Sequence, residues 1–248
     1  MRIVAIIPSR YGSSRFPGKP LASIAGRPMI EHVYRRVSLC EEISDVFTAT
    51  DDQRILACVE GFGGKAVMTR KTHASGTDRL AESAGLLDLE DGDLVVNVQG
   101  DQPLVDPAVL AEMVEPLVHD ESLSMSTLMV RIHDPGELSN PNHVKVVCDA
   151  RGFALYFSRL PIPFHRDAAT DGVHYKHLGL YAYRTAFLRA FTGLPEGRLE
   201  RAEKLEQLRA LEHGHRIRVV ETVHDSPEVD TPEDLARIES MMARTQPP

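Results

Sequence analysis

The chain begins with a short apolar segment, residues 3–7, that runs directly into a loop rich in glycine, serine and proline. The loop carries three cations, Arg10, Arg15 and Lys19, although the whole chain has a formal net charge of −8. In α/β folds, ligands bind outside the carboxyl ends of the parallel strands. Glycine and serine let backbone N–H groups approach phosphate oxygens, and cations neutralise those oxygens. The start of the chain therefore predicts a phosphate-binding loop after the first strand of an α/β sheet.

Strand and helix patterns alternate through the first half of the chain. This order predicts an α/β fold with a doubly wound, mainly parallel sheet. The glycine fingerprint of NAD-dependent dehydrogenases and the Walker A phosphate loop do not occur, which disfavours both classes. The predicted strands are residues 3–7, 46–50, 66–69 and 94–98, and the predicted helices begin near Pro28, Gln53 and Asp78.

The second half of the chain changes character, with a hairpin turn signal at residues 149–152 and a polar loop at 165–175. A charged helix is predicted over residues 198–213, and a last helix after Thr231. We expect one domain, residues 1–248, with an inserted β-hairpin region. The predicted strands here are residues 123–132, 144–148, 153–158, 177–183 and 217–223.

The composition narrows the classes of partner. A hydrophobic content of 42% is enough for a real core. The net charge of −8 disfavours a general nucleic-acid or anionic-membrane binder, because either needs a basic face. The cysteines Cys40, Cys58 and Cys148 lie far apart and predict free thiols in a reducing compartment. With no leader pattern and no apolar stretch of membrane-spanning length, we expect a cytoplasmic protein.

Two aspartates are candidate ligands for Mg²⁺, a cation that proteins bind through one or two carboxylates and substrate phosphates. Asp101 follows the predicted strand 94–98, at the same edge of the sheet as the basic loop. A turn-forming role for Asp101 is the alternative. Asp230 precedes a helix start at Thr231 and Pro232, so by itself it is as well explained by a favourable charge near that helix end.

Two further segments allow a structural and a functional interpretation. Residues 75–79 read as a helix start with Thr77 as N-cap, or as a loop that reads a base. In the predicted helix 198–213, leucines form the buried stripe, so Glu206 and Gln207 are expected to face solvent.

Eight blocks of the chain resemble, in order and nearly from end to end, the 3-deoxy-manno-octulosonate cytidylyltransferases. The first block alone is shared with other nucleotidyltransferases, including sialic acid cytidylyltransferases, whereas the whole set is specific. The blocks are residues 7–21, 49–51, 75–79, 97–101, 154–159, 177–181, 205–209 and 229–235.

The resemblance implies a nucleotide-diphospho-sugar transferase-like fold and transfer of CMP from CTP to an eight-carbon acidic sugar, with release of pyrophosphate. The product would serve lipopolysaccharide synthesis, and the family forms homodimers through its hairpin region. The resemblance implies a CTP site formed by Arg10, Arg15, Lys19, Ser75, Thr77 and Arg79, and catalytic roles for Arg10, Lys19 and Asp101. It implies Asp101 and Asp230 as the ligands of Mg²⁺. The implied sugar site consists of Gln99, Arg159, His177, Tyr181, Glu206 and Gln207.

The chain departs from the common family pattern at three positions. Gln102 stands where a glutamate is usual, Asp78 replaces a glutamate, and Ser9 replaces an alanine. Because some enzymes of this group act on an 8-amino analogue of the sugar, that substrate, or another acidic sugar, is the alternative. A non-catalytic nucleotide-binding protein is a further alternative, which the intact cations and aspartates disfavour.

Overall fold

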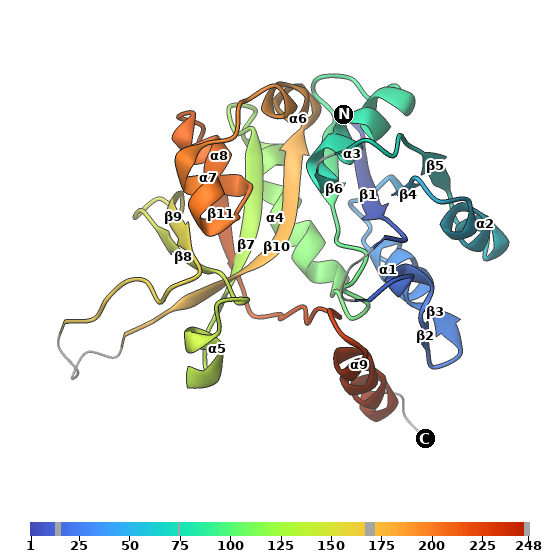
Figure 1. The fold of residues 1–248 in the computed structure, drawn as a ribbon. Helices are drawn as coiled ribbons and strands as arrows, with labels where there is room; N and C mark the ends of the chain where they lie inside the picture. Colours follow the sequence, from blue (N-terminus) through green and yellow to red (C-terminus); the bar gives the residue numbers. More distant parts are fainter. Residues whose placement is uncertain (13–15, 74, 167–171, 246–248) are drawn as a thin grey trace.

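The structure, a computed structural model, describes residues 1–12, 16–73, 75–166 and 172–245. A nine-stranded sheet forms its centre, and helices cover both faces of that sheet (Figure 1). A hairpin of two strands, β8 (Lys145–Cys148) and β9 (Ala154–Ser158), is attached to β10. The other strands are β1 (Ile3–Ser9), β4 (Asp45–Thr50), β5 (Ala66–Met68), β6 (Leu94–Asn97), β7 (Met125–Arg131), β10 (Tyr175–Arg184) and β11 (Arg218–Thr222).

The strand order across the sheet is β11-β7-β10-β6-β1-β4-β5. β1 pairs in parallel with β4 and β6, β4 pairs in parallel with β5, and β11 pairs in parallel with β7. β10 runs antiparallel to the three strands that pair with it, β6, β7 and β8. The predicted doubly wound, mainly parallel sheet is confirmed. Because β1, β4 and β6 share one direction, their carboxyl ends lie along one edge, where ligands bind in such folds.

The continuous apolar run of β1 packs against helices on both faces of the sheet. Ala5 and Ile7 face the core under α1, α2 and α4, whereas Val4 and Ile6 face the core under α3, α6 and α8. Burying a Val or Ile side chain stabilises the fold by about 1.5–3 kcal/mol. These helices are α1 (Met29–Val37), α2 (Gln53–Gly61), α3 (Gly76–Leu86), α4 (Pro107–His119), α6 (Thr185–Thr192) and α8 (Gln207–Glu212).

A small third cluster brings the two ends of the chain together. Ile24 and Met29 from the start of the chain pack with Val229 and Ile238 from its end. The elements concerned are η1 (Lys19–Leu21), β2 (Ser23–Ile24), β3 (Arg27–Pro28) and α9 (Pro232–Thr245). This packing places the segment before α9 beside the loop that follows β1.

The structure corrects two predictions of local structure. The predicted helix 198–213 is broken into α7 (Arg198–Glu203) and α8, because Lys204 takes a left-handed conformation with φ 54°. The N-cap of α3 is Ser75, whose hydroxyl accepts a hydrogen bond from the Asp78 N–H, and not Thr77. Three helices, α4, α6 and the short α5 (Pro135–Ser139), have no counterpart among the predicted elements. Within the described residues, no helix is both long and apolar enough to cross a bilayer.

A bulge interrupts β10 between His177 and Tyr181. Gly179 stands in this bulge with φ +68°, a conformation that side chains with a Cβ disfavour. The backbone carbonyls of the bulge accept side-chain hydrogen bonds from Gln102, Gln99 and Thr127. Bulges of this kind re-aim side chains and often lie next to active sites.

We predict that Gly179→Ala lowers the free energy of unfolding by about 1–2 kcal/mol, because alanine pays the left-handed penalty that glycine avoids. Denaturant unfolding measures this change. Gly85→Ala in α3 is the matched control, since nothing lies within 4 Å of an added Cβ there. In a helix this exchange stabilises by up to about 1 kcal/mol. Equal effects of the two substitutions would contradict the role of the bulge.

Candidate active site

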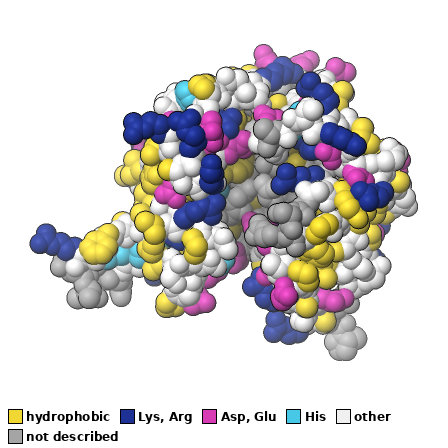
Figure 2. All heavy atoms as spheres, viewed as in Figure 1, with side chains coloured by type: hydrophobic (Ala, Val, Ile, Leu, Met, Phe, Trp, Pro, Cys, Tyr) yellow, Lys and Arg dark blue, Asp and Glu magenta, His cyan; other side chains and the backbone are white. Residues whose placement is uncertain are grey.

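A cavity of about 330 Å³ opens at the carboxyl ends of the parallel strands. Figure 2 shows the surface hollowed at this edge of the sheet, between the side that carries the hairpin and the side that carries α1 and α2. The lining residues come from the end of β1, from η1, from the start of α3, from the loop after β6 and from the segment before α9. They are Pro8, Ser9, Arg10, Lys19, Pro20, His73, Ser75, Gly76, Arg79, Gln99, Gly100, Asp101 and Asp230.

Lys19 joins the two predicted metal ligands. Its ammonium lies 2.6 Å from Asp101 Oδ2 and 3.5 Å from Asp230 Oδ1, and it also donates to the carbonyl of Val229 at 2.9 Å. Only 15% of the Lys19 side chain is exposed, so these contacts are partly shielded from water. The arrangement brings together residues 82 and 211 positions apart in the sequence. The structure therefore places the basic loop, the end of β6 and the segment before α9 in one site.

The carboxylate pair suits a divalent cation of the Mg²⁺ type. Asp101 Oδ1 is buried and, among the described residues, has no hydrogen-bond partner. An acceptor left in this state costs about 1–3 kcal/mol, and a bound cation would satisfy it. No cluster of three or more His, Cys, Asp or Glu side chains that could hold a metal occurs in the described part of the chain. Mg²⁺ does not need one, because it binds through one or two carboxylates with waters and substrate phosphates.

Some of the residues predicted to bind the nucleotide line the cavity. Arg10 is exposed on the cavity wall, and Ser75 caps α3 there. Arg79 also lines the cavity but is paired with Asp51 and Thr69, so its guanidinium is held by the protein. The predicted Arg15 lies outside the described residues, as does the central part of the polar loop, residues 167–171.

Thr77 is buried, is not among the residues that line the cavity, and contacts a second group of predicted residues. Its hydroxyl donates to Glu206 Oε2, and burial raises the pKa of the Glu206 carboxyl. The expectation that Glu206 and Gln207 face solvent is wrong: Glu206 is half-buried and Gln207 is buried. The break at Lys204 accounts for the difference, because the single amphipathic helix that predicted exposed positions ends there, and Glu206 and Gln207 instead form the N-cap and the first residue of α8.

The bulge of β10 carries two further residues predicted for the sugar. His177 is buried, with its Nε2 2.8 Å from Thr127 Oγ1 and its ring 5.3 Å from that of Tyr181. Burial lowers the pKa of His177 to about 3 and raises the pKa of Tyr181 well above its usual range, so both are neutral. Gln99 reaches the same bulge, 3.4 Å from the Gly179 carbonyl, and also lines the cavity. Of these three residues, Gln99 lines the cavity, whereas His177 and Tyr181 are buried behind the bulge and are not among the lining residues.

Glu228 is a residue of this region that the sequence analysis missed. It keeps contact with solvent, yet protein surrounds it closely. Burial, and then the negative charges of Asp101 and Asp230, raise the pKa of its carboxyl to about 7. No motif marks it, and only its position two residues before Asp230 could have suggested it.

Comparisons with known proteins agree with this geometry. The cytidylyltransferase family model matches residues 4–217. A 3-deoxy-manno-octulosonate cytidylyltransferase of Syntrophus aciditrophicus is 59% identical, covering 97% of both chains. An 8-amino-3,8-dideoxy-manno-octulosonate cytidylyltransferase of Shewanella pealeana is 55% identical, covering 98% of this chain and 99% of that protein.

A solved structure extends the match to three dimensions. CMP:2-keto-3-deoxy-manno-octonic acid synthetase, complexed with CTP, superposes with a TM-score of 0.94 at 43% identity, covering 99% of this chain and 100% of that one. The chain belongs to the cytidylyltransferase family. A 4-diphosphocytidyl-2C-methyl-D-erythritol synthase of Anaerococcus prevotii, with a TM-score of 0.64 at 17% identity, shares the fold.

In this cytidylyltransferase, Arg159 is fixed by backbone carbonyls. Its guanidinium donates to the carbonyls of Glu203 and Lys204, where α7 ends, and to the carbonyl of Pro141. The Glu203 carboxylate in turn accepts from the Arg159 N–H and from the Ser158 hydroxyl. The side chain is therefore placed between the hairpin and the break that carries Glu206.

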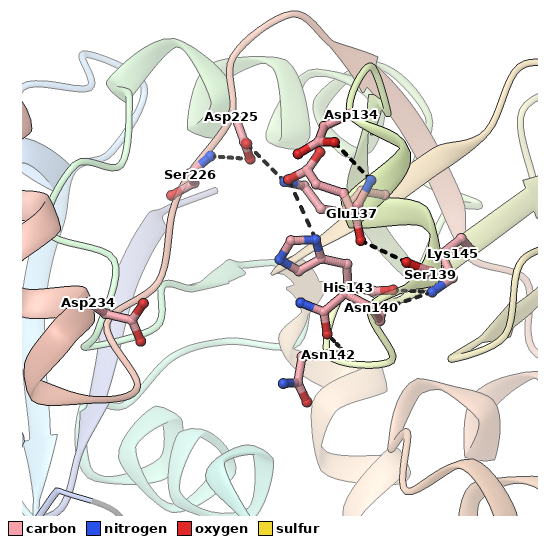
Figure 3. A network of polar contacts seen from close by, with 12 residues as sticks. Asp134, Glu137, Ser139, Asn140, Asn142, His143, Lys145, Asp225, Ser226 and Asp234 are labelled. Atoms are coloured by element: carbon pink, nitrogen blue, oxygen red, sulfur yellow. Dashed lines mark hydrogen bonds and ion pairs between the residues drawn. The ribbon is translucent and has the colours of Figure 1, made fainter.

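A buried lysine, Lys145, donates a hydrogen bond to the backbone carbonyl of Arg159. Lys145 is fully buried, and its ammonium donates to the carbonyls of Asn140, His143 and Arg159 at 3.1, 2.7 and 2.6 Å. Figure 3 shows Lys145 directed at the loop that carries Asn140 and His143. Burial lowers the pKa of this ammonium, and the three carbonyls offset part of the cost of desolvating it. Lys145 thus ties the hairpin to the loop before it.

We predict that Lys145→Met lowers the free energy of unfolding by roughly 2–4 kcal/mol, because it leaves three buried carbonyls without their charged donor. Lys65→Met is the matched control. The Lys65 side chain is 59% exposed in its pair with Asp45, and such pairs contribute less than about 1 kcal/mol. Thermal and denaturant unfolding of both variants measures the difference. Similar small losses would show that Lys145 does not hold the hairpin.

Proposed function

We propose that this chain transfers CMP from CTP to the anomeric hydroxyl of an eight-carbon acidic sugar, 3-deoxy-manno-octulosonate or its 8-amino analogue. The hydroxyl oxygen attacks the α-phosphorus, a new P–O bond forms, and the bond to the leaving pyrophosphate breaks. The hydroxyl proton passes to solvent, and pyrophosphate takes the electron pair of the broken bond. The reaction needs positioning and charge neutralisation more than covalent help from the protein.

One observation carries the proposal: Lys19 lies between Asp101 and Asp230 on the wall of a cavity at the carboxyl ends of the parallel strands. Lys19 and Arg10 would neutralise the phosphates of CTP. Asp101 and Asp230 would hold Mg²⁺, which supplies further neutralisation of the phosphoryl oxygens when it is bound. The buried Asp101 Oδ1, for which the described residues provide no hydrogen-bond donor, supports this assignment.

The sugar would lie on the side of His177, Tyr181 and Gln99. Arg159 is the candidate for its carboxylate. A guanidinium has five N–H donors, and three of them already fix the side chain to backbone carbonyls. The remaining donors suit an oxygen pair of a carboxylate.

Pyrophosphate release from CTP and Mg²⁺ tests the proposal, with each of three sugars supplied in parallel: 3-deoxy-manno-octulosonate, its 8-amino analogue and sialic acid. Release that depends on one of the first two sugars is the expected result. CTP binding without release from any sugar would contradict the proposed activity and favour a non-catalytic nucleotide-binding protein. Removal of Mg²⁺ by a chelator should abolish release, and added Mg²⁺ should restore it.

We predict that Asp101→Asn lowers kcat at least about 100-fold, because it removes a charge that the phosphoryl transfer site needs. The fold should be retained, since Asn keeps the shape of the side chain. Asp91→Asn is the matched control: its carboxylate is 74% exposed and pairs with Arg189 away from the cavity. Steady-state kinetics and circular dichroism of both variants make the comparison. Unchanged turnover in a folded Asp101→Asn variant would remove Asp101 from the metal site.

We also propose a homodimer formed through the hairpin region, acting in the cytoplasm, where CTP is made. Large apolar side chains on and after β9 support the dimer, because Leu155, Leu160 and Phe164 are 62%, 72% and 88% exposed. Free cysteines support a reducing compartment.

We predict that Phe164→Asp shifts the protein from dimer to monomer in analytical ultracentrifugation, because a charge replaces the apolar side chain at the proposed contact. Leu39→Asp is the control, since Leu39 is 68% exposed at the end of α1, away from the hairpin. A monomeric wild-type protein at micromolar concentration would contradict the dimer.

A further inference from the structure

Glu228 is held in place by a neighbouring amide. Gln102 Nε2 donates to Glu228 Oε1 at 3.2 Å and to the Leu178 carbonyl at 3.1 Å. A Cβ added to Gly179 would lie 3.7 Å from Glu228 Oε1. Gln102 is fully buried, and its amide oxygen has no partner in the described part of the chain. The pair Gln102–Glu228 therefore rests against the bulge of β10.

This position lies between the two halves of the site. The bulge separates His177 from Tyr181, the residues that would face the sugar. On the other side, the N–H of Val229, the residue after Glu228, donates to the Asp101 carbonyl at 2.9 Å. Glu228 therefore lies next to the segment that carries the predicted metal ligands. The Glu228 residue as a whole keeps contact with solvent. A sugar seated against the bulge would have the Glu228 carboxylate beside it.

Glu228 lies in an acidic environment. Asp101 and Asp230 act on its carboxyl group as negative charges, and Lys19 acts on it as a positive charge. Mg²⁺ needs only one or two carboxylates. With Asp101 and Asp230 committed to the metal, Glu228 is a third carboxylate that the phosphoryl transfer does not use.

Gln102 matters because it is neutral. Its amide N–H donates to Glu228, whereas a glutamate at this position would set a second negative charge next to Glu228. The Gln102 side chain thus fixes the Glu228 carboxylate without neutralising it. A glutamate at position 102 would remove this N–H donor from Glu228.

The two candidate sugars differ by one group, a neutral hydroxyl or an amino group that is protonated at neutral pH. A hydrogen bond from an ammonium to a carboxylate is about twice as strong as one between neutral groups. Resting on the cytidylyltransferase activity above, we propose that Glu228, held by Gln102, binds the cationic amino group of the sugar and makes the 8-amino sugar the preferred substrate.

The test compares kcat/KM for the 8-amino sugar and for its 8-hydroxyl counterpart, with CTP and Mg²⁺ saturating. The wild-type enzyme should prefer the amino sugar, and Glu228→Gln should lower the ratio of the two kcat/KM values by about 10- to 100-fold. Gln102→Glu should lower the same ratio, because it places a second carboxylate against the first. Glu121→Gln, an exposed glutamate in the loop before β7, should leave the ratio unchanged.

The ratio separates a specificity role from a structural one. A fold or metal defect would lower both kcat/KM values together and leave their ratio unchanged, which would overturn the proposal. A wild-type preference for the hydroxyl sugar would overturn it as well. Failure to release pyrophosphate with either sugar would instead contradict the proposed function itself, so the two failures are distinguishable.

Discussion

The contact of one ammonium with two carboxylates organises this molecule. Lys19 joins the loop after β1, the end of β6 and the segment before α9, and these three pieces lie far apart in the sequence. The small apolar cluster that contains Ile24 and Val229 also packs the segment after β1 against the segment before α9. Partial burial strengthens the Coulomb attraction, because water screens it less. The doubly wound sheet places the ends of β1 and β6 at one edge. The contacts of Lys19 with Asp101 and Asp230 then hold the loop after β1, the end of β6 and the segment before α9 together at that edge.

The antiparallel strand β10 brings further polar groups to the edge of the sheet at which Lys19 lies. In a purely parallel sheet every strand would end at the same edge, whereas β10 crosses the middle of the sheet and brings its bulge to that edge. The bulge turns three carbonyls toward side chains from other elements, Gln99, Gln102 and Thr127. One irregularity in an otherwise regular strand therefore places these side chains, and the predicted sugar-binding residues His177 and Tyr181, at one edge of the sheet.

Local signals in the sequence predicted the strand–loop start, the hairpin turn at residues 149–152 and most elements of the first half, because each depends on neighbouring residues. The contact of Lys19 with Asp230 could not be predicted from periodicity, since it joins the two ends of the chain. The break at Lys204 escaped prediction for a similar reason. The Arg159 guanidinium donates to the carbonyls of Glu203 and Lys204 at the break, and Arg159 lies 45 residues before Lys204 in the sequence. The pattern within residues 198–213 therefore could not indicate this partner.

The geometry around Lys145 also restricts which cation could stand there. An ammonium has three N–H donors, and here each has one carbonyl to meet. A guanidinium would bring five donors in a rigid plane, and the surplus donors would be buried without acceptors. An exchange of lysine for arginine, ordinarily mild on a surface, would thus strain the junction between the hairpin and the loop that precedes it.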